Sequence, residues 1–326
     1  MTAKRRRIAV VFGVLFSVLF GLLVVLVPYR PILIVGPTVE SVPLSLAAPI
    51  PGLRLYVFNT GANRMSSLLV GASPPWRAVP AFVIEHPSHG LVVFDLGLSH
   101  AVAERGEDAI PPPVGWLMES RGRPGLTLES QMREAGLLPD QVETVVISHL
   151  HGDHIGVADE FAHAAFIGGP GTRERMVGGS HPAFPSGVVP EWREVDFHGG
   201  EDVAPVGPFD SSIDLFGDGS ILLVSGGGGH TREDLMMLVN LASGPVLLTG
   251  DAVVHFDWLE SDDVERIAID PERAAAIRNR VRSLRDSGEA LIIPGHDLRR
   301  LGAARPDLIH HHPERFSPTA WPIGEE

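Results

Sequence analysis

The most informative stretch of this chain is His149-Leu150-His151-Gly152-Asp153-His154. It places three imidazoles and a carboxylate within six residues, directly after the apolar, strand-like residues 142–148. Imidazole and carboxylate groups are ligands of zinc, iron and related ions. Four ligands this close together would bind a single ion with poor angles, whereas two neighbouring ions can share them well. We therefore interpret the stretch as half of a dinuclear metal site and expect the rest of the chain to supply the other half.

Composition sets the class of protein. The chain has 326 residues, of which 44% are hydrophobic and 20% charged, as in a globular protein with one large domain and appendages. Its net charge is −14, which disfavours nucleic acid as a partner because phosphate contacts need basic patches. The absence of cysteine excludes disulfides, thiolate metal sites and cysteine nucleophiles. Any metal must therefore be held by histidine and carboxylate.

Residues 8–27 form an uncharged apolar run that predicts a transmembrane helix, since twenty helical residues span about 30 Å. Lys4, Arg5, Arg6 and Arg7 precede it. By the positive-inside rule we expect residues 1–7 to be cytoplasmic, residues 8–27 to be an uncleaved signal anchor, and the catalytic domain to be extracytoplasmic. A cleaved signal peptide is the alternative, although its apolar run would usually be shorter.

The rest of the chain divides by composition. Residues 28–52 contain six prolines and predict an extended linker, residues 53–305 a hydrolase domain, and residues 306–326 a Pro-rich tail. The histidine run 310–312 in that tail is expected to be solvated.

Apolar periodicity predicts a run of strands and then strands alternating with helices, which is typical of an α/β layered protein. The predicted strands cover residues 54–59, 81–85, 91–94, 142–148, 161–167, 212–216, 221–225, 235–241, 246–249 and 291–293, and the predicted helices cover 126–136 and 271–287. His149, His230, Asp251 and His296 each follow a predicted strand. Side chains at strand ends converge on one edge of a sheet, so we expect these four to lie together.

Four segments in this order resemble the metallo-β-lactamase-fold hydrolases. They are His149-x-His151-x-Asp153-His154, Gly229-His230-Thr231, Thr249-Gly250-Asp251 and Pro294-Gly295-His296-Asp297. Residues 79–87, 94–97 and 295–297 resemble the N-acyl homoserine lactonase branch in particular. The resemblance covers residues 53 to 300 and implies a four-layer αββα sandwich with the site at one edge, here preceded by the predicted N-terminal transmembrane helix.

The resemblance also implies a role for each ligand. His149, His151 and His230 would hold one metal, Asp153, His154 and His296 the second, and Asp251 would bridge both, with Asp95 as a structural aspartate beside them. Zinc is the expected ion, and iron, manganese and cobalt are alternatives. One position departs from the pattern: lactonases usually carry a tyrosine three residues after the bridging aspartate, where this chain has Val254. His255 or Thr231 could take its place.

The expected chemistry is hydrolysis of a lactone or related ester by a hydroxide that bridges the two metals. Asp153 and Asp251 are the expected catalytic residues, with Asp153 as proton shuttle to the leaving group. The alternatives are a β-lactamase, a glyoxalase II-like thioesterase or a phosphotriesterase on the same fold, a mononuclear iron persulfide dioxygenase, and a metal-stabilised binding domain. The expected partners are a small-molecule substrate and, through the N-terminal helix, a membrane.

Overall fold

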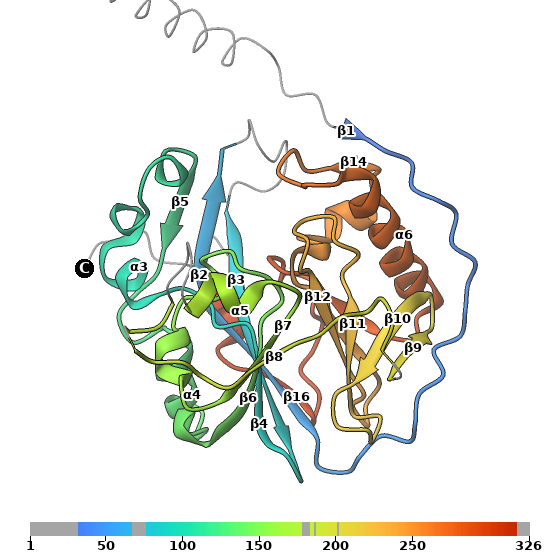
Figure 1. Cartoon of the computed structure of the whole chain (residues 1–326), viewed down its shortest axis with the longest axis horizontal. Helices are drawn as coiled ribbons and strands as arrows, with labels where there is room; N and C mark the ends of the chain where they lie inside the picture. Colours follow the sequence, from blue (N-terminus) through green and yellow to red (C-terminus); the bar gives the residue numbers. More distant parts are fainter. Residues whose placement is uncertain (1–31, 67–75, 178–182, 186, 201, 318–326) are drawn as a thin grey trace, which may run out of the picture. The chain divides into compact units, whose positions relative to one another are not determined.

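The computed structural model describes residues 32–66, 76–177, 183–185, 187–200 and 202–317. Within residues 32–317 two β-sheets lie face to face, and helices cover the outer face of each sheet (Figure 1). This is the predicted αββα order of layers.

The first sheet has eight strands in the order β16-β2-β3-β4-β6-β7-β8, with β5 paired to β2. Strands β2, β3 and β4 form an antiparallel meander, and β4, β6, β7 and β8 run parallel to one another. The strands are β2 (Arg54–Met65), β3 (Arg77–His86), β4 (Gly90–Phe94), β5 (Met118–Arg121), β6 (Val142–Val146), β7 (Ala165–Gly168), β8 (Trp192–Glu194) and β16 (Leu308–His310).

The second sheet has six strands in the order β15-β13-β12-β11-β10-β9, all antiparallel except the pair β13 and β15. They are β9 (Val203–Val206), β10 (Phe209–Asp214), β11 (Ile221–Ser225), β12 (Leu235–Val239), β13 (Val246–Leu248) and β15 (Leu291–Ile293). A separate two-stranded sheet pairs β1 (Ile32–Leu33) with β14 (Asp263–Val264).

Helices occupy the two outer layers. On the first sheet lie α3 (His100–Arg105), α4 (Leu128–Glu134) and α5 (Thr172–Val177), and on the second lies α6 (Pro271–Ser287) (Figure 1). The side chain of Asp270 caps α6 by accepting from the Arg273 amide, and Gly288 ends it with a φ of 73°. Short 3₁₀ turns are η1 (Gly106–Ala109), η2 (Val114–Trp116), η3 (Pro139–Gln141), η4 (Ala158–Phe161), η5 (Gly250–Ala252), η6 (Phe256–Leu259) and η7 (Pro313–Arg315).

Alternation of apolar side chains along the strands builds three cores at once. In β12, Leu235, Met237 and Val239 face the first sheet, whereas Met236 and Leu238 pack toward α6. A strand with one face on each layer must be apolar on both, which explains why residues 235–239 form a continuous apolar run.

The predicted strand 161–167 is only partly correct. Phe161 ends the 3₁₀ turn η4, and the Ala164 amide donates to the Phe161 carbonyl, so extended structure begins at Ala165. The apolar character of Phe161 reflects burial in the turn rather than a place in the strand. The sequence did not predict four short strands, because each contains too few apolar residues to show a strand pattern. They are β5, β8, β9 and β16.

The proline-rich stretch after Pro31 contacts the layered body at several points. Arg278, only 2% exposed, donates to the Ile34 carbonyl, and the Asn240 amide group donates to the Ala47 carbonyl. Leu44 and Leu46 pack against the apolar cluster beneath α6. The stretch is extended, as its prolines predict, but it lies on the protein surface along this length.

The predicted localisation requires a correction. The predicted transmembrane residues 8–27 lie outside the described residues, and none of the helices that are described is long and apolar enough to cross a membrane. The longest, α6, has 17 residues and carries charges such as Arg278 and Arg282 along its length. The prediction of a single-pass membrane protein with an extracytoplasmic catalytic domain is therefore not supported by any described helix.

Candidate metal centre

The loop after β6 presents the ligand-rich stretch at the edge of the sandwich. The amide of Ser148 donates to Asp95 Oδ1, and the Ser148 carbonyl accepts from the Leu235 amide of β12, so the loop is fixed to both sheets. The His154 amide then donates to the His151 carbonyl at 3.0 Å. This tight turn brings side chains five positions apart to the same side of the loop.

A first group of side chains surrounds one point. Nε2 of His149 lies 2.8 Å from Nδ1 of His151, which lies 3.1 Å from Nε2 of His230. Oδ2 of Asp251 is 3.3 Å from Nε2 of His230 and 3.8 Å from Nε2 of His149. All four ligand atoms lie within 4.8 Å of one another, so this group could hold one ion.

A second group lies beside the first. Nε2 of His296 is 3.3 Å from Nε2 of His154 and 3.4 Å from Oδ2 of Asp153. Oδ1 of Asp251 stands 3.3 Å from Nε2 of His296 and 3.6 Å from Nε2 of His154. Asp153, His154 and His296 could therefore hold a second ion, and Asp251 turns one carboxylate oxygen toward each group. All seven predicted side chains come together.

The donor set fits metal ions in a further respect. Oδ1 of Asp251 is buried and has no hydrogen-bond partner among the described residues. An unpaired carboxylate oxygen in a closed site carries a large desolvation cost, and a bound cation removes it.

Neighbouring groups orient the imidazoles. Nδ1 of His154 donates to Asp95 Oδ2 at 2.8 Å, and Nδ1 of His296 donates to the Ala78 carbonyl at 2.7 Å. The carboxylate of Asp234 accepts from the His230 amide and thereby fixes the glycine-rich turn before it. These hydrogen bonds on Nδ1 of His154 and of His296 leave Nε2 of both rings free to bind metal.

Burial and charge give the two groups different protonation. Burial lowers the pKa of His149 and that of His230, the latter to about 3. Burial acts in the same direction on His154, but the carboxylates of Asp95, Asp251 and Asp153 outweigh it and raise the pKa of His154 to about 10. The first group thus offers neutral imidazoles, and a cation at the second group would displace the inner proton of His154.

A cavity of about 330 Å³ opens onto the two groups. Four of the candidate ligands line it, namely His151, Asp153, Asp251 and His296, together with the apolar side chains of Met65, Val114, Leu117, Met118, Leu150 and Ile267. Asn63, Arg77 and Glu265 add polar groups that the sequence analysis missed, because they stand on strands or loops without a motif around them. Arg77 and Glu265 form a buried ion pair of 2.8 Å there.

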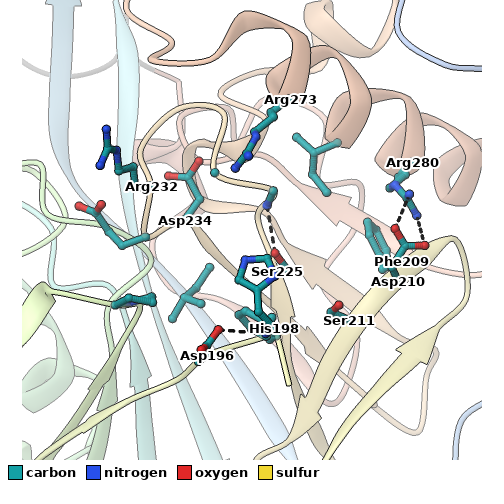
Figure 2. A pocket seen from close by; sticks show the side chains of 17 residues that line it. Asp196, His198, Phe209, Asp210, Ser211, Ser225, Arg232, Asp234, Arg273 and Arg280 are labelled. Carbon is teal, nitrogen blue, oxygen red and sulfur yellow. Dashed lines mark hydrogen bonds and ion pairs between the residues drawn. The ribbon is translucent and has the colours of Figure 1, made fainter. Parts of the chain in front are cut away.

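The candidates to replace the lactonase tyrosine do not line this cavity. His255 is 1% exposed, as is Val254, which stands at the position of the tyrosine. Thr231 uses its hydroxyl to donate a hydrogen bond to Asp234, and none of the three residues lines the cavity. A second cavity, of about 310 Å³, lies behind the glycine-rich turn, where Arg280 pairs with Asp210 (Figure 2). None of the seven predicted ligands lines this second cavity, so it is separate from the candidate metal centre.

Comparison with known proteins agrees with the geometry. Residues 74–296 match the Metallo-beta-lactamase superfamily. The chain belongs to this superfamily. N-acyl homoserine lactonase AttM of Azorhizobium caulinodans is 30% identical over 268 residues, covering 75% of this chain and 93% of that protein. AttM of Rhizobium radiobacter is 26% identical over 261 residues, with the same coverage of each chain.

A solved structure shares the fold of this metallo-β-lactamase-fold chain. It is an N-acyl homoserine lactone hydrolase with N-hexanoyl-L-homoserine at its catalytic metal centre, and it superposes with a TM-score of 0.61 at 18% identity. The match covers 82% of this chain and 98% of that one. Together the family and its relatives identify a lactonase-like metallohydrolase.

Proposed function

We propose that the chain hydrolyses a lactone or a related ester with two divalent metal ions, zinc being the expected ion. The main support for this proposal is that Asp251 lies between the two groups of ligands. Its Oδ2 is 3.3 Å from Nε2 of His230, and its Oδ1 is 3.3 Å from Nε2 of His296. His149, His151 and His230 would hold the first ion, and Asp153, His154 and His296 the second. Bound there, the ions would lower the pKa of a water to around 7 and polarise the substrate carbonyl.

Residues of the chain supply the rest of the reaction. The apolar lining of the cavity would position a substrate with an apolar chain, as the relatives named N-acyl homoserine lactonase suggest. Asp153 faces the cavity and is held by a hydrogen bond of 2.6 Å from the Asn63 amide group to its Oδ2. It is the carboxylate placed to pass a proton to the leaving alkoxide when the ring opens.

The test compares the full chain with His149→Ala and Asp251→Ala, measuring metal content and hydrolysis of acyl lactones. Both variants should lose bound metal and hydrolysis together, with activity reduced by a factor of at least about a thousand, as expected for loss of the group that activates water. His163→Ala is the matched control, because His163 is exposed and belongs to neither group.

A panel of β-lactams, thioesters and phosphotriesters, assayed on the same preparation, separates the lactonase from the other hydrolases of this fold. Full lactone hydrolysis by metal-free protein would refute the mechanism. Preference for another substrate class would refute the lactone assignment while leaving the metal site in place.

A further inference from the structure

A second cluster of metal-binding side chains lies where the histidine run 310–312 meets α4. The sequence predicted a solvated run, but the flanking Leu308 and Phe316 are buried, and the His311 amide donates to the Val57 carbonyl of β2 at 3.0 Å. The His311 and His312 side chains are 14% and 29% exposed. The run is held against the body of the protein.

Glu134, the last residue of α4, faces both imidazoles. Its Oε1 lies 2.9 Å from Nε2 of His312, and its Oε2 lies 3.7 Å from Nε2 of His311. The ligand atoms of the three residues all lie within 4.8 Å of one another. Two ligands of a tetrahedral ion with bonds of 2.0–2.1 Å stand about 3.3 Å apart, so the two distances bracket the spacing that a zinc-like ion needs.

The hydrogen bonds of the two rings favour a cation over a simple ion pair. Nδ1 of His312 lies 2.7 Å from Oε1 of Glu314, and a carboxylate on one ring nitrogen commonly accompanies a metal on the other. Nε2 of His311 is buried and has no hydrogen-bond partner within the described part of the chain. A protonated His312 could donate hydrogen bonds to both Glu134 and Glu314, but Nε2 of His311 would still have no partner. A cation bound by Glu134, His311 and His312 would give Nε2 of His311 a partner.

We propose that Glu134, His311 and His312 bind one zinc-class transition-metal ion, with water completing its coordination. The ion would join the segment after β16 to the end of α4, two elements far apart in the sequence. Arg315 has Nη1 3.9 Å from Oε2 of Glu134, and its positive charge makes the site weaker than the seven-ligand centre. The proposal is independent of the reaction at that centre.

The test is equilibrium dialysis of the full chain against a series of free Zn²⁺ concentrations, followed by measurement of bound zinc and of the thermal midpoint. Wild type should bind one zinc more than the double variant His311→Gln/His312→Gln, and zinc should raise the midpoint of wild type more than that of the double variant. Glu134→Gln keeps the shape of the side chain and should weaken zinc binding at this site about tenfold or more, because it removes the anionic ligand.

His310→Gln is the matched control, since His310 is the adjacent histidine and lies outside the cluster, with its ring tilted against Phe316 at a centroid distance of 5.5 Å. It should bind as much zinc as wild type, and lactone hydrolysis should be unchanged in all four proteins. Equal zinc content in wild type and the double variant across the whole series would overturn the proposal and would leave an ion pair between His312 and Glu134.

Discussion

Nδ1 of His154 lies 2.8 Å from Oδ2 of Asp95, and this contact fixes which nitrogen of the ring faces the metal centre. Asp95 holds its position at a cost, because its φ of 60° lies in the left-handed region that few side chains adopt. The amide and hydroxyl of Ser148 donate to the same carboxylate, so three hydrogen bonds maintain the strained residue.

Replacing Asp95 by asparagine should weaken metal binding, because the amide cannot match the anionic acceptor that orients His154. Loss of such a partner typically lowers metal affinity ten- to a hundredfold, and we expect the loss at the group formed by Asp153, His154 and His296. Metal content after dialysis measures it. Asp159→Asn is the control on an exposed aspartate. Unchanged affinity in Asp95→Asn would contradict an orienting role.

Replacing Asn63 by alanine should lower kcat, because Oδ2 of Asp153 loses its 2.6 Å hydrogen bond. A hydrogen bond to a charged group contributes about 1.5–3 kcal/mol, which corresponds to a fall of roughly ten- to a hundredfold. Ser120→Ala removes only the bond that Ser120 donates to Asn63 Oδ1 and should cost less. Steady-state kinetics with metal content measured in parallel tests this order. A larger loss in Ser120→Ala than in Asn63→Ala would refute it.

Replacing Leu117 by tryptophan should narrow the cavity beside the candidate metal centre. Leu117 lines it and is 40% exposed, so the larger ring need not disturb the core. KM for long-chain acyl lactones should rise several-fold, because a long chain excluded from this part of the cavity loses about 1 kcal/mol or more of apolar contact. KM for short-chain lactones should change little. Leu138→Trp is the matched control, at 42% exposure and away from the cavity. An equal effect of both substitutions would show that Leu117 does not contact the substrate.

His255 should make stability depend on pH. Burial lowers its pKa to about 4 from an ordinary 6.5, so the unfolded chain binds more protons between these values. The free energy of unfolding is therefore unaffected by His255 above pH 6.5. It falls by up to about 3 kcal/mol as the pH is lowered toward 4, because protons bind His255 in the unfolded chain first. Urea unfolding of His255→Leu at several pH values should show a shallower slope in this window. The exposed His163→Leu should keep the wild-type slope, and an unaltered slope in His255→Leu would contradict the assignment.

The four motifs and their resemblance to metallo-β-lactamase-fold hydrolases predicted the seven candidate ligands, which stand in the loops after β6, β11, β13 and β15. Asn63 and Arg77 could not be found in this way. They are paired across β2 and β3, and only that pairing, between residues fourteen positions apart, brings both to the cavity.

Strand periodicity predicted the layers, and the resemblance of four local motifs to metallo-β-lactamase-fold hydrolases predicted the fold and the candidate metal ligands. Tertiary packing established which polar groups line the cavity, that Val254 is buried away from it, and that the histidine run meets Glu134. These relationships depend on segments far apart in the chain, and no local pattern records which distant surfaces will come into contact when both sheets pack together.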